Sequence, residues 1–168
     1  MQVENLIDKI RKGCTIENLI VDQEICISGD KTKNKVQFEK CKISSLIMEN
    51  VEFKNQVIFK NCIIENISFA MSYFRKGLII EDCIFNSHVD FQCGIQNTNG
   101  IVSIERNTFN KFLNFFDCEF KSQLFFSKNT LLVGTNLLGN KGTPFEVQFN
   151  VLPLIEDNKG TLTKNGEN

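Results

Sequence analysis

The chain has 168 residues, of which 42% are apolar, and its formal net charge is −1. This apolar content excludes an intrinsically disordered chain, and the near-neutral charge gives no field that would attract nucleic acid or a membrane surface. Because no run of about 18 apolar residues and no apolar N-terminal segment occurs, we expect neither a transmembrane helix nor a signal peptide.

The first predicted element is a short helix over residues 2–12, which places Leu6, Ile7 and Ile10 on one side. A helix with one apolar side needs a surface to cover. The open end of a repeat fold exposes core residues and strand edges. We therefore expect residues 1–13 to form a cap over the N-terminal end of the repeats that follow.

Residues 14–155 repeat an apolar pattern with a period of five. From Val57 to Phe69, two apolar residues stand two positions apart, two other residues follow, and the pattern recurs. Longer units of about 21 to 24 residues contain four such groups, and Cys41, Cys62 and Cys83 recur at intervals of 21. Because residues i and i+2 of an extended chain share a face, each group predicts one inward-facing side followed by a corner.

Four such sides make one coil, and stacked coils make an all-β parallel solenoid. Inward residues at equal positions should form vertical ladders. The last unit is expected to continue the pair Leu124 and Phe126 with Val147 and Phe149. One ladder should run through cysteines and then asparagines, and we interpret it as core packing: Cys41, Cys62, Cys83, Asn107 and Asn129.

The repeats resemble the pentapeptide-repeat family over about residues 14–154. The resemblance rests on the five-residue period, on Phe, Ile or Leu at the central inward position, and on Cys or Ser two positions earlier. It implies a right-handed quadrilateral β-helix, here of about six coils. Cys and Val stand where the family commonly has Ala, and six-residue insertions such as Phe85 to Phe91 relax the square. A less regular right-handed β-helix of the polysaccharide-processing kind is the structural alternative.

After the coils, residues 156–168 are polar, and we expect a flexible tail. The longest insertions fall at the corner between the fourth and the first side, where basic residues gather. Solvated turn residues would explain them, and a docking strip for an anionic partner is the functional alternative. The residues of this basic edge are Lys31, Lys33, Lys35, Lys54, Arg75, Lys76, Lys121 and Lys141.

Outward residues of the first two sides include apolar ones that a solenoid does not need. One coil separates Ile58 from Ile79, and one coil separates Ile63 from Ile84. Contiguous apolar surface often marks an interface, although isoleucine also favours strands in general. The candidate interface residues are Ile58, Ile63, Ile79, Ile84 and Phe125.

Residues that commonly carry catalysis or bind metals are scarce. His88 is the only histidine, the seven cysteines contain no CxxC pair, and no GxSxG, HExxH, P-loop or dinucleotide motif occurs. Cys26 is the one cysteine that we expect to face outward. We therefore expect no cofactor, no metal site and no disulfide scaffold, and a reduced, cytoplasmic location.

Together these features favour a non-enzymatic protein–protein interaction or scaffold module that presents rigid faces. The expected partner is another protein or a second copy, with an anionic partner at the basic edge as an alternative; neither a membrane nor a small-molecule substrate is expected. The family resemblance implies a second hypothesis, a DNA mimic that binds or inhibits DNA gyrase or topoisomerase. A third is a carbohydrate-active β-helix enzyme, for which Asp90 on the third side is weak support.

Overall fold

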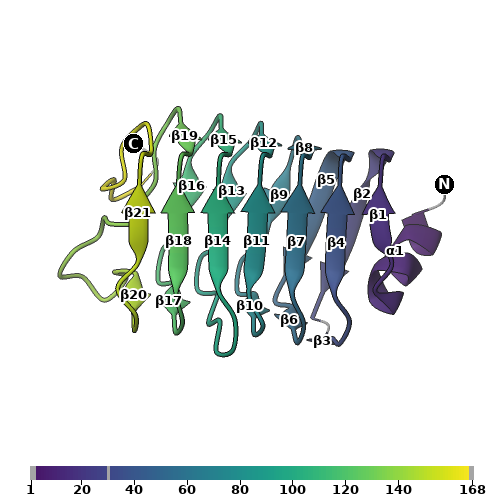
Figure 1. The fold of residues 1–168 in the computed structure, drawn as a ribbon, viewed down its shortest axis with the longest axis horizontal. Coiled ribbons are helices and arrows are strands. Elements are labelled where there is room, and N and C mark those ends of the chain that lie inside the picture. Colours follow the sequence, from purple (N-terminus) through teal and green to yellow (C-terminus); the bar gives the residue numbers. More distant parts are fainter. Residues whose placement is uncertain (1–2, 30, 167–168) are drawn as a thin grey trace.

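The computed structural model describes residues 3–29 and 31–166 and shows a parallel β-solenoid with one short helix (Figure 1). In Figure 1 the front strands all run upward and the chain returns behind them, while successive coils step from the N-terminus on the right to the C-terminus on the left. The solenoid is therefore right-handed. This confirms the fold class that the five-residue pattern predicts.

Helix α1 (Val3–Lys12) covers the N-terminal end of the solenoid. Its apolar side contributes Leu6 and Ile10, which are 2% and 1% exposed and join the core of the first coils. Gly13 ends the helix in a left-handed conformation with a φ of 79°, which glycine adopts without steric cost. The described part of the predicted cap thus has the expected place, and residues 1–2 lie outside the described residues.

Sheet A is the longest continuous face and takes one strand from each coil. All its strands are parallel and in register, so equivalent residues of successive coils stand side by side. The strands, in spatial order, are β1 (Thr15–Glu17), β4 (Val36–Glu39), β7 (Val57–Lys60), β11 (Leu78–Glu81), β14 (Val102–Glu105), β18 (Leu124–Ser127) and β21 (Leu154–Glu156).

Sheet B forms the second and third sides. In the first coils one long strand spans both sides, whereas later coils break into two short strands separated by a corner, which gives the four-sided section. Its strands are β2 (Ile20–Ser28), β5 (Lys42–Glu49), β8 (Ile63–Ile64), β9 (Ile67–Ser68), β12 (Ile84–Phe85), β13 (Val89–Asp90), β15 (Thr108–Phe109), β16 (Leu113–Asn114) and β19 (Thr130–Leu131).

The fourth side is made of two small parallel groups. Their strands are β3 (Lys31–Thr32), β6 (Glu52–Phe53) and β10 (Tyr73–Phe74), and then β17 (Glu119–Phe120) and β20 (Gln148–Phe149).

The corner after sheet A has the same backbone in coil after coil. Its turning residue is left-handed, with φ between 51° and 57°, a conformation that asparagine and aspartate tolerate better than other residues that carry a side chain. Lysine and arginine also occur there, so backbone bonding to the next coil must offset a modest strain. The turning residues are Asn18, Lys40, Asn61, Asp82, Arg106, Lys128 and Asp157.

The residue after each of these corners points inward and builds the predicted cysteine–asparagine ladder. The Cys62 backbone N–H donates to Cys83 Sγ at 3.4 Å, and the Cys83 N–H donates to Asn107 Oδ1 at 2.9 Å. The Asn107 N–H donates to Asn129 Oδ1 at 3.0 Å, and the Asn129 N–H to Asn158 Oδ1 at 2.9 Å. The column is therefore a chain of hydrogen bonds as well as packing.

Phenylalanine rings fill much of the interior in stacks that follow the strand spacing. Phe38 lies on Phe59 with ring centroids 5.2 Å apart and planes 4° from parallel, and Phe85 lies on Phe109 at 4.9 Å. Both distances are close to the spacing of about 4.8 Å between neighbouring strands. A residue without a polar atom suits this dry position, which accounts for the phenylalanine-rich composition.

The last coil differs from the prediction in register and in length. Val147 is buried and Phe149 pairs with Phe120, so both lie on the fourth side, and Ile155 instead follows Phe126 on sheet A. The prediction was wrong because the insertion 138–146 follows the third side, where Thr135 pairs with Leu113, and does not replace the fourth side. The expected tail is corrected as well for residues 156–166: Lys159 N–H donates to Asn129 O at 2.8 Å, and this segment continues the coil.

Candidate protein-binding face

Sheet A presents the outward side chains of seven aligned strands on one face of the rod. The central outward row of this face can be followed from register partners in successive coils. Ile58 pairs with Ile79, then come Ser103, Phe125 and Leu154. Strand pairing therefore places Ile79, Phe125 and Leu154 in one row, which the polar, buried Ser103 interrupts.

Two further apolar residues lie beside this row, Ile101 directly before β14 and Leu152 two positions before β21. Ile101 is 44% exposed, and Leu152 is 88% exposed. Leu154 is 44% exposed, while Ile79 and Phe125 are half-buried. We call these five residues the sheet A strip.

The end of each sheet A strand bears a mostly acidic outward row that borders the strip. Its members are Glu17, Glu39, Lys60, Glu81, Glu105, Ser127 and Glu156. Lys60 pairs with Glu81 at 3.0 Å, and Arg106 at the next corner contacts Asp82 at 2.9 Å and Glu105 at 3.5 Å. The strip thus has the arrangement of a typical interface, an apolar centre with a charged rim.

The structure separates the isoleucines that we expected to form one contiguous patch. Ile58 points outward by register but is only 6% exposed, so it offers little contact surface. Ile63 and Ile84 are 39% and 40% exposed and pair with each other on sheet B. Along the chain, the ion pair between Lys60 and Glu81 separates the isoleucine pair on sheet A from the isoleucine pair on sheet B. The two sheets therefore carry two distinct apolar columns.

The basic edge is interrupted by acidic partners. Lys31 and Arg75 both pair with Glu52, at 3.4 and 3.0 Å, and Lys121 pairs with Glu119 at 3.1 Å. The hydrogen bond from Arg75 lowers the pKa of the Glu52 carboxyl. Because these ion pairs compensate part of its charge, the basic edge is less continuous than the sequence suggested.

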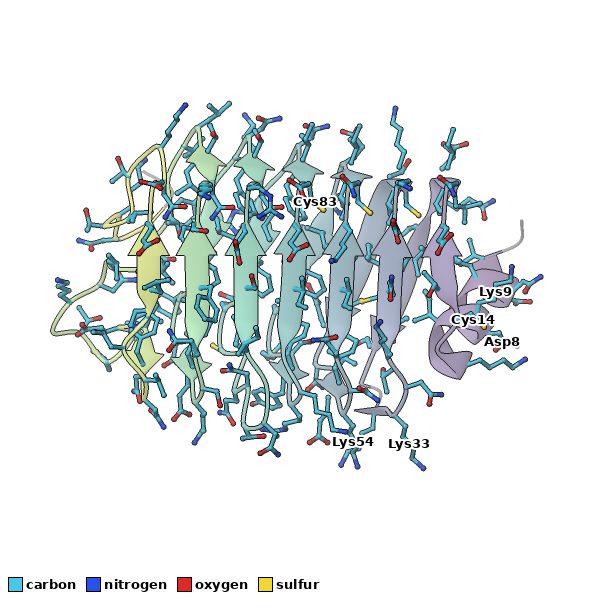
Figure 2. The ribbon with its side chains drawn as sticks, viewed as in Figure 1. Asp8, Lys9, Cys14, Lys33, Lys54 and Cys83 are labelled. Atoms are coloured by element: carbon cyan, nitrogen blue, oxygen red, sulfur yellow. The ribbon has the colours of Figure 1, made fainter. Side chains whose placement is uncertain are left out.

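The remaining basic-edge lysines make no ion pair within the described residues: Lys33, Lys35, Lys54, Lys76 and Lys141. Lys33 and Lys54 occupy adjacent coils, since Thr32 pairs with Phe53, and both extend from the lower edge in Figure 2. Lys141 lies in the segment between β19 and β20, which forms no strand.

Sequence reasoning missed three members of the strip, Ile101, Leu152 and Leu154. For Leu152 and Leu154 the signal was hidden by the misplaced register of the last coil. Ile101 ends a long insertion, where the five-residue pattern assigns no face. Its position follows only from the pairing of Leu78 with Val102.

The cysteine ladder is buried, whereas Cys14, Cys26 and Cys93 are exposed, so Cys26 faces outward as expected but is not alone in doing so. Burial and the nearby Asp117 carboxylate raise the pKa of the Cys93 thiol, which disfavours the reactive thiolate. Burial likewise raises the pKa of Cys118, whose thiol donates to Phe91 O at 2.9 Å.

Within residues 3–29 and 31–166, no group of three or more His, Cys, Asp or Glu side chains is arranged to hold a metal ion. In the same part of the chain, no helix is both long and apolar enough to cross a membrane. Comparison with known proteins found no matching family model, no matching curated protein and no matching solved structure.

Proposed function

We propose that this protein is a non-enzymatic binding module that docks another protein on the sheet A strip. The observation that carries the proposal is the group of outward apolar side chains on one rigid sheet: Ile101, Leu152 and Leu154 are exposed, and Ile79 and Phe125 are half-buried. Such a surface loses little conformational entropy on binding, because its backbone is already ordered. A cytoplasmic location is part of the same proposal and is supported by seven unpaired cysteines.

The rim indicates the chemistry of the partner surface. Glu81, Glu105 and Glu156 border the strip on one side, and Lys60 is the basic member of that row. A complementary surface would have an apolar centre with basic side chains along one border. Rim charges steer association more than they fix affinity, so raising the salt concentration should slow association more than it speeds dissociation.

The test replaces two strip residues by lysine, Phe125→Lys together with Leu154→Lys. Proteins bound by the immobilised wild-type chain should be lost from this variant, with affinity at least tenfold weaker, because two desolvated lysines would lie in the contact. The matched control is Ile63→Lys with Ile84→Lys, which places the same charges on the other apolar column.

The proposal fails if the control variant loses its bound proteins while the strip variant retains them, since the contact would then lie on sheet B. Light scattering on the same three proteins reports self-association. A wild-type dimer that becomes a monomer only in the strip variant would identify the partner as a second copy.

The topoisomerase-binding hypothesis rests on the resemblance to the pentapeptide-repeat family and stays a prediction. Its physical requirement is an acidic surface that imitates DNA, and the carboxylate row on sheet A is interrupted by Lys60 and bordered by Arg106. A gyrase supercoiling assay tests it directly. The carbohydrate-active hypothesis is likewise untested, and activity on a panel of glycans would support it.

A further inference from the structure

The strand β2 (Ile20–Ser28) has an unpaired long edge. It is the longest strand of the molecule and pairs only with β5 within the described residues. In a parallel ladder, alternate residues bond to a given neighbour, and the Gly29 N–H donates to Glu49 O at the end of β5. The backbone groups of Glu24, Cys26 and Ser28 therefore point to the open side.

On sheet A, the opposite end of the solenoid lacks one backbone donor for strand addition. At the first inward position of sheet A, the backbone N–H bonds to the next coil, as Val57 does to Gly77 O and Leu78 to Ile101 O. Pro153 occupies this position in the last coil, because Leu154 pairs with Phe125. Proline has no N–H, so it removes the donor that would pair with an added strand. Along Glu24–Ser28, β2 contains no proline.

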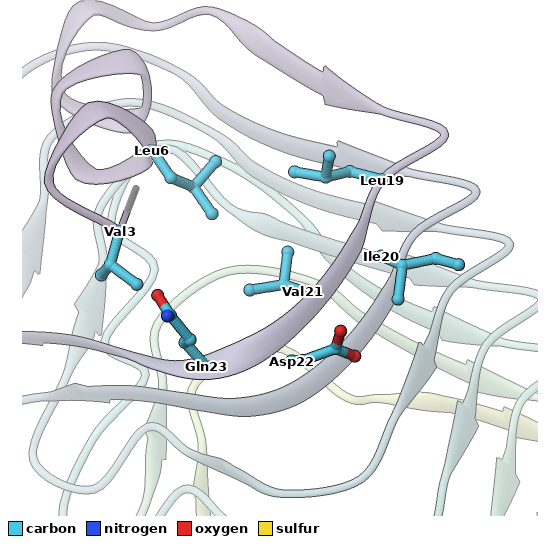
Figure 3. A pocket seen from close by; sticks show the side chains of 7 residues that line it. All are labelled: Val3, Leu6, Leu19, Ile20, Val21, Asp22 and Gln23. Atoms are coloured by element: carbon cyan, nitrogen blue, oxygen red, sulfur yellow. The ribbon is translucent and has the colours of Figure 1, made fainter. Parts of the chain in front are cut away.

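A cleft of about 170 Å³ lies between helix α1 and β2, beside this open edge. Figure 3 shows Val3 and Leu6 on the helix facing Leu19 and Val21 across a shared space, with Gln23 at its rim. The lining is mixed, with Val3, Leu6, Leu19 and Val21 on the inner side and the polar Asp22 and Gln23 beside them. The volume is enough for one large side chain, whose apolar part would contact Leu6 and Val21.

A one-residue bulge places polar side chains at the mouth of the cleft. Val21 pairs with Ile43 and Glu24 with Ser45, so Asp22 and Gln23 together oppose a single residue of β5. Bulges commonly occur on edge strands, where they redirect side chains.

The segment around the open edge is acidic. Residues 15–28 contain Glu17, Asp22 and Glu24 and no lysine or arginine, and all three carboxylates are on exposed residues. One carboxylate oxygen of Glu24 accepts a hydrogen bond from the Ser45 hydroxyl at 3.0 Å. An added strand with basic side chains would compensate this charge, whereas an acidic strand would be repelled.

We infer that β2 is a second binding site, which takes an extended basic peptide segment of a partner protein. The segment adds a parallel or antiparallel strand to the open side of Glu24–Ser28, and one of its apolar side chains enters the cleft beside Val21. In this mode main-chain hydrogen bonds supply affinity and the side-chain cleft supplies selectivity. The site is separate from the sheet A strip and does not depend on it.

The test is selection of random twelve-residue peptides displayed on phage against the immobilised 168-residue protein. Enriched peptides are expected to combine lysine or arginine with one large apolar residue. The affinities of synthetic versions are then measured by fluorescence anisotropy against variants that are checked for folding by circular dichroism.

Two variants probe the edge and its charge. Cys26→Pro removes an outward N–H and leaves the β5 bonds of Ile25 and Ile27, so binding should weaken at least tenfold, whereas Cys26→Ser should bind as the wild type does. If Cys26→Pro does not fold, Asp22→Lys with Glu24→Lys serves instead and should also weaken binding at least tenfold. Phe125→Lys should bind the peptides unchanged.

The inference is overturned if no peptide is enriched above a control panned against the Asp22→Lys, Glu24→Lys variant. It is equally overturned if the enriched peptides are acidic, or if they bind every folded edge variant as tightly as the wild type. If Phe125→Lys is the only variant that loses peptide binding, the peptides bind to the sheet A strip and not to β2.

Discussion

Asn129 shows how one side chain can connect three coils of the solenoid. Its Oδ1 accepts from the Asn107 backbone N–H at 3.0 Å, and its Nδ2 donates to Ile104 O at 2.8 Å and to Asn158 Oδ1 at 3.0 Å. The residue is fully buried, so each of these groups would lose its partner in a dry environment if the amide were removed.

We predict that Asn129→Ala lowers the free energy of unfolding by about 2–4 kcal/mol, because a buried N–H and a buried carbonyl remain unsatisfied. Asn129→Cys should cost about half as much, since Cys83 in the same ladder accepts the Cys62 N–H through its sulfur. Urea unfolding followed by circular dichroism measures both. Equal losses in the two variants would show that a sulfur at this position replaces neither the hydrogen bonds nor the packing of the asparagine amide.

At the scale of elements, the five-residue pattern was sufficient to predict sides, corners and core. Inward pairs such as Val57 and Phe59 or Cys62 and Ile64 are buried, because successive side chains of a strand point to opposite faces. In the last coil Phe149 is only half-buried. What the pattern could not predict was the length of an insertion, and the segment before Val147 shifted the last coil by one side.

The candidate site was harder to predict than the fold. An outward position is not the same as an exposed one: Ile58 points away from the core and is still covered, whereas Leu152 is open to solvent. Exposure depends on side chains of neighbouring coils and on insertions between them. A single-sequence pattern does not contain that information.

Helix α1 provides the element-scale prediction. Ile10 is 1% exposed against the first coil, while Ile7 is only partly buried. We predict that Ile10→Ala lowers the unfolding free energy by about 2–4 kcal/mol through lost burial and a residual cavity, and that Ile7→Ala costs clearly less. Thermal and urea unfolding provide the measurement. If neither substitution lowers stability, α1 is not a cap that contributes to folding.

At the scale of the whole molecule, the rod has two unlike ends and one long continuous face, sheet A, which carries the strip. Helix α1 covers the core at one end and leaves the edge of β2 open, whereas Pro153 removes an edge donor at the other. Between them, pairing in register lines up the outward residues of sheet A. A rigid array of this kind suits recognition, because each ladder position repeats at the strand spacing along the rod.

The most direct measurement places a photo-cross-linking amino acid at position 125 on the sheet A strip, in the full chain expressed in the cells from which the protein comes. A matched chain carries the same amino acid at Thr130, which is half-buried on sheet B. Irradiation should give discrete protein adducts from position 125 and few from position 130. Absence of adducts from position 125, or equal adducts from both positions, would contradict the proposal that the sheet A strip is the binding face.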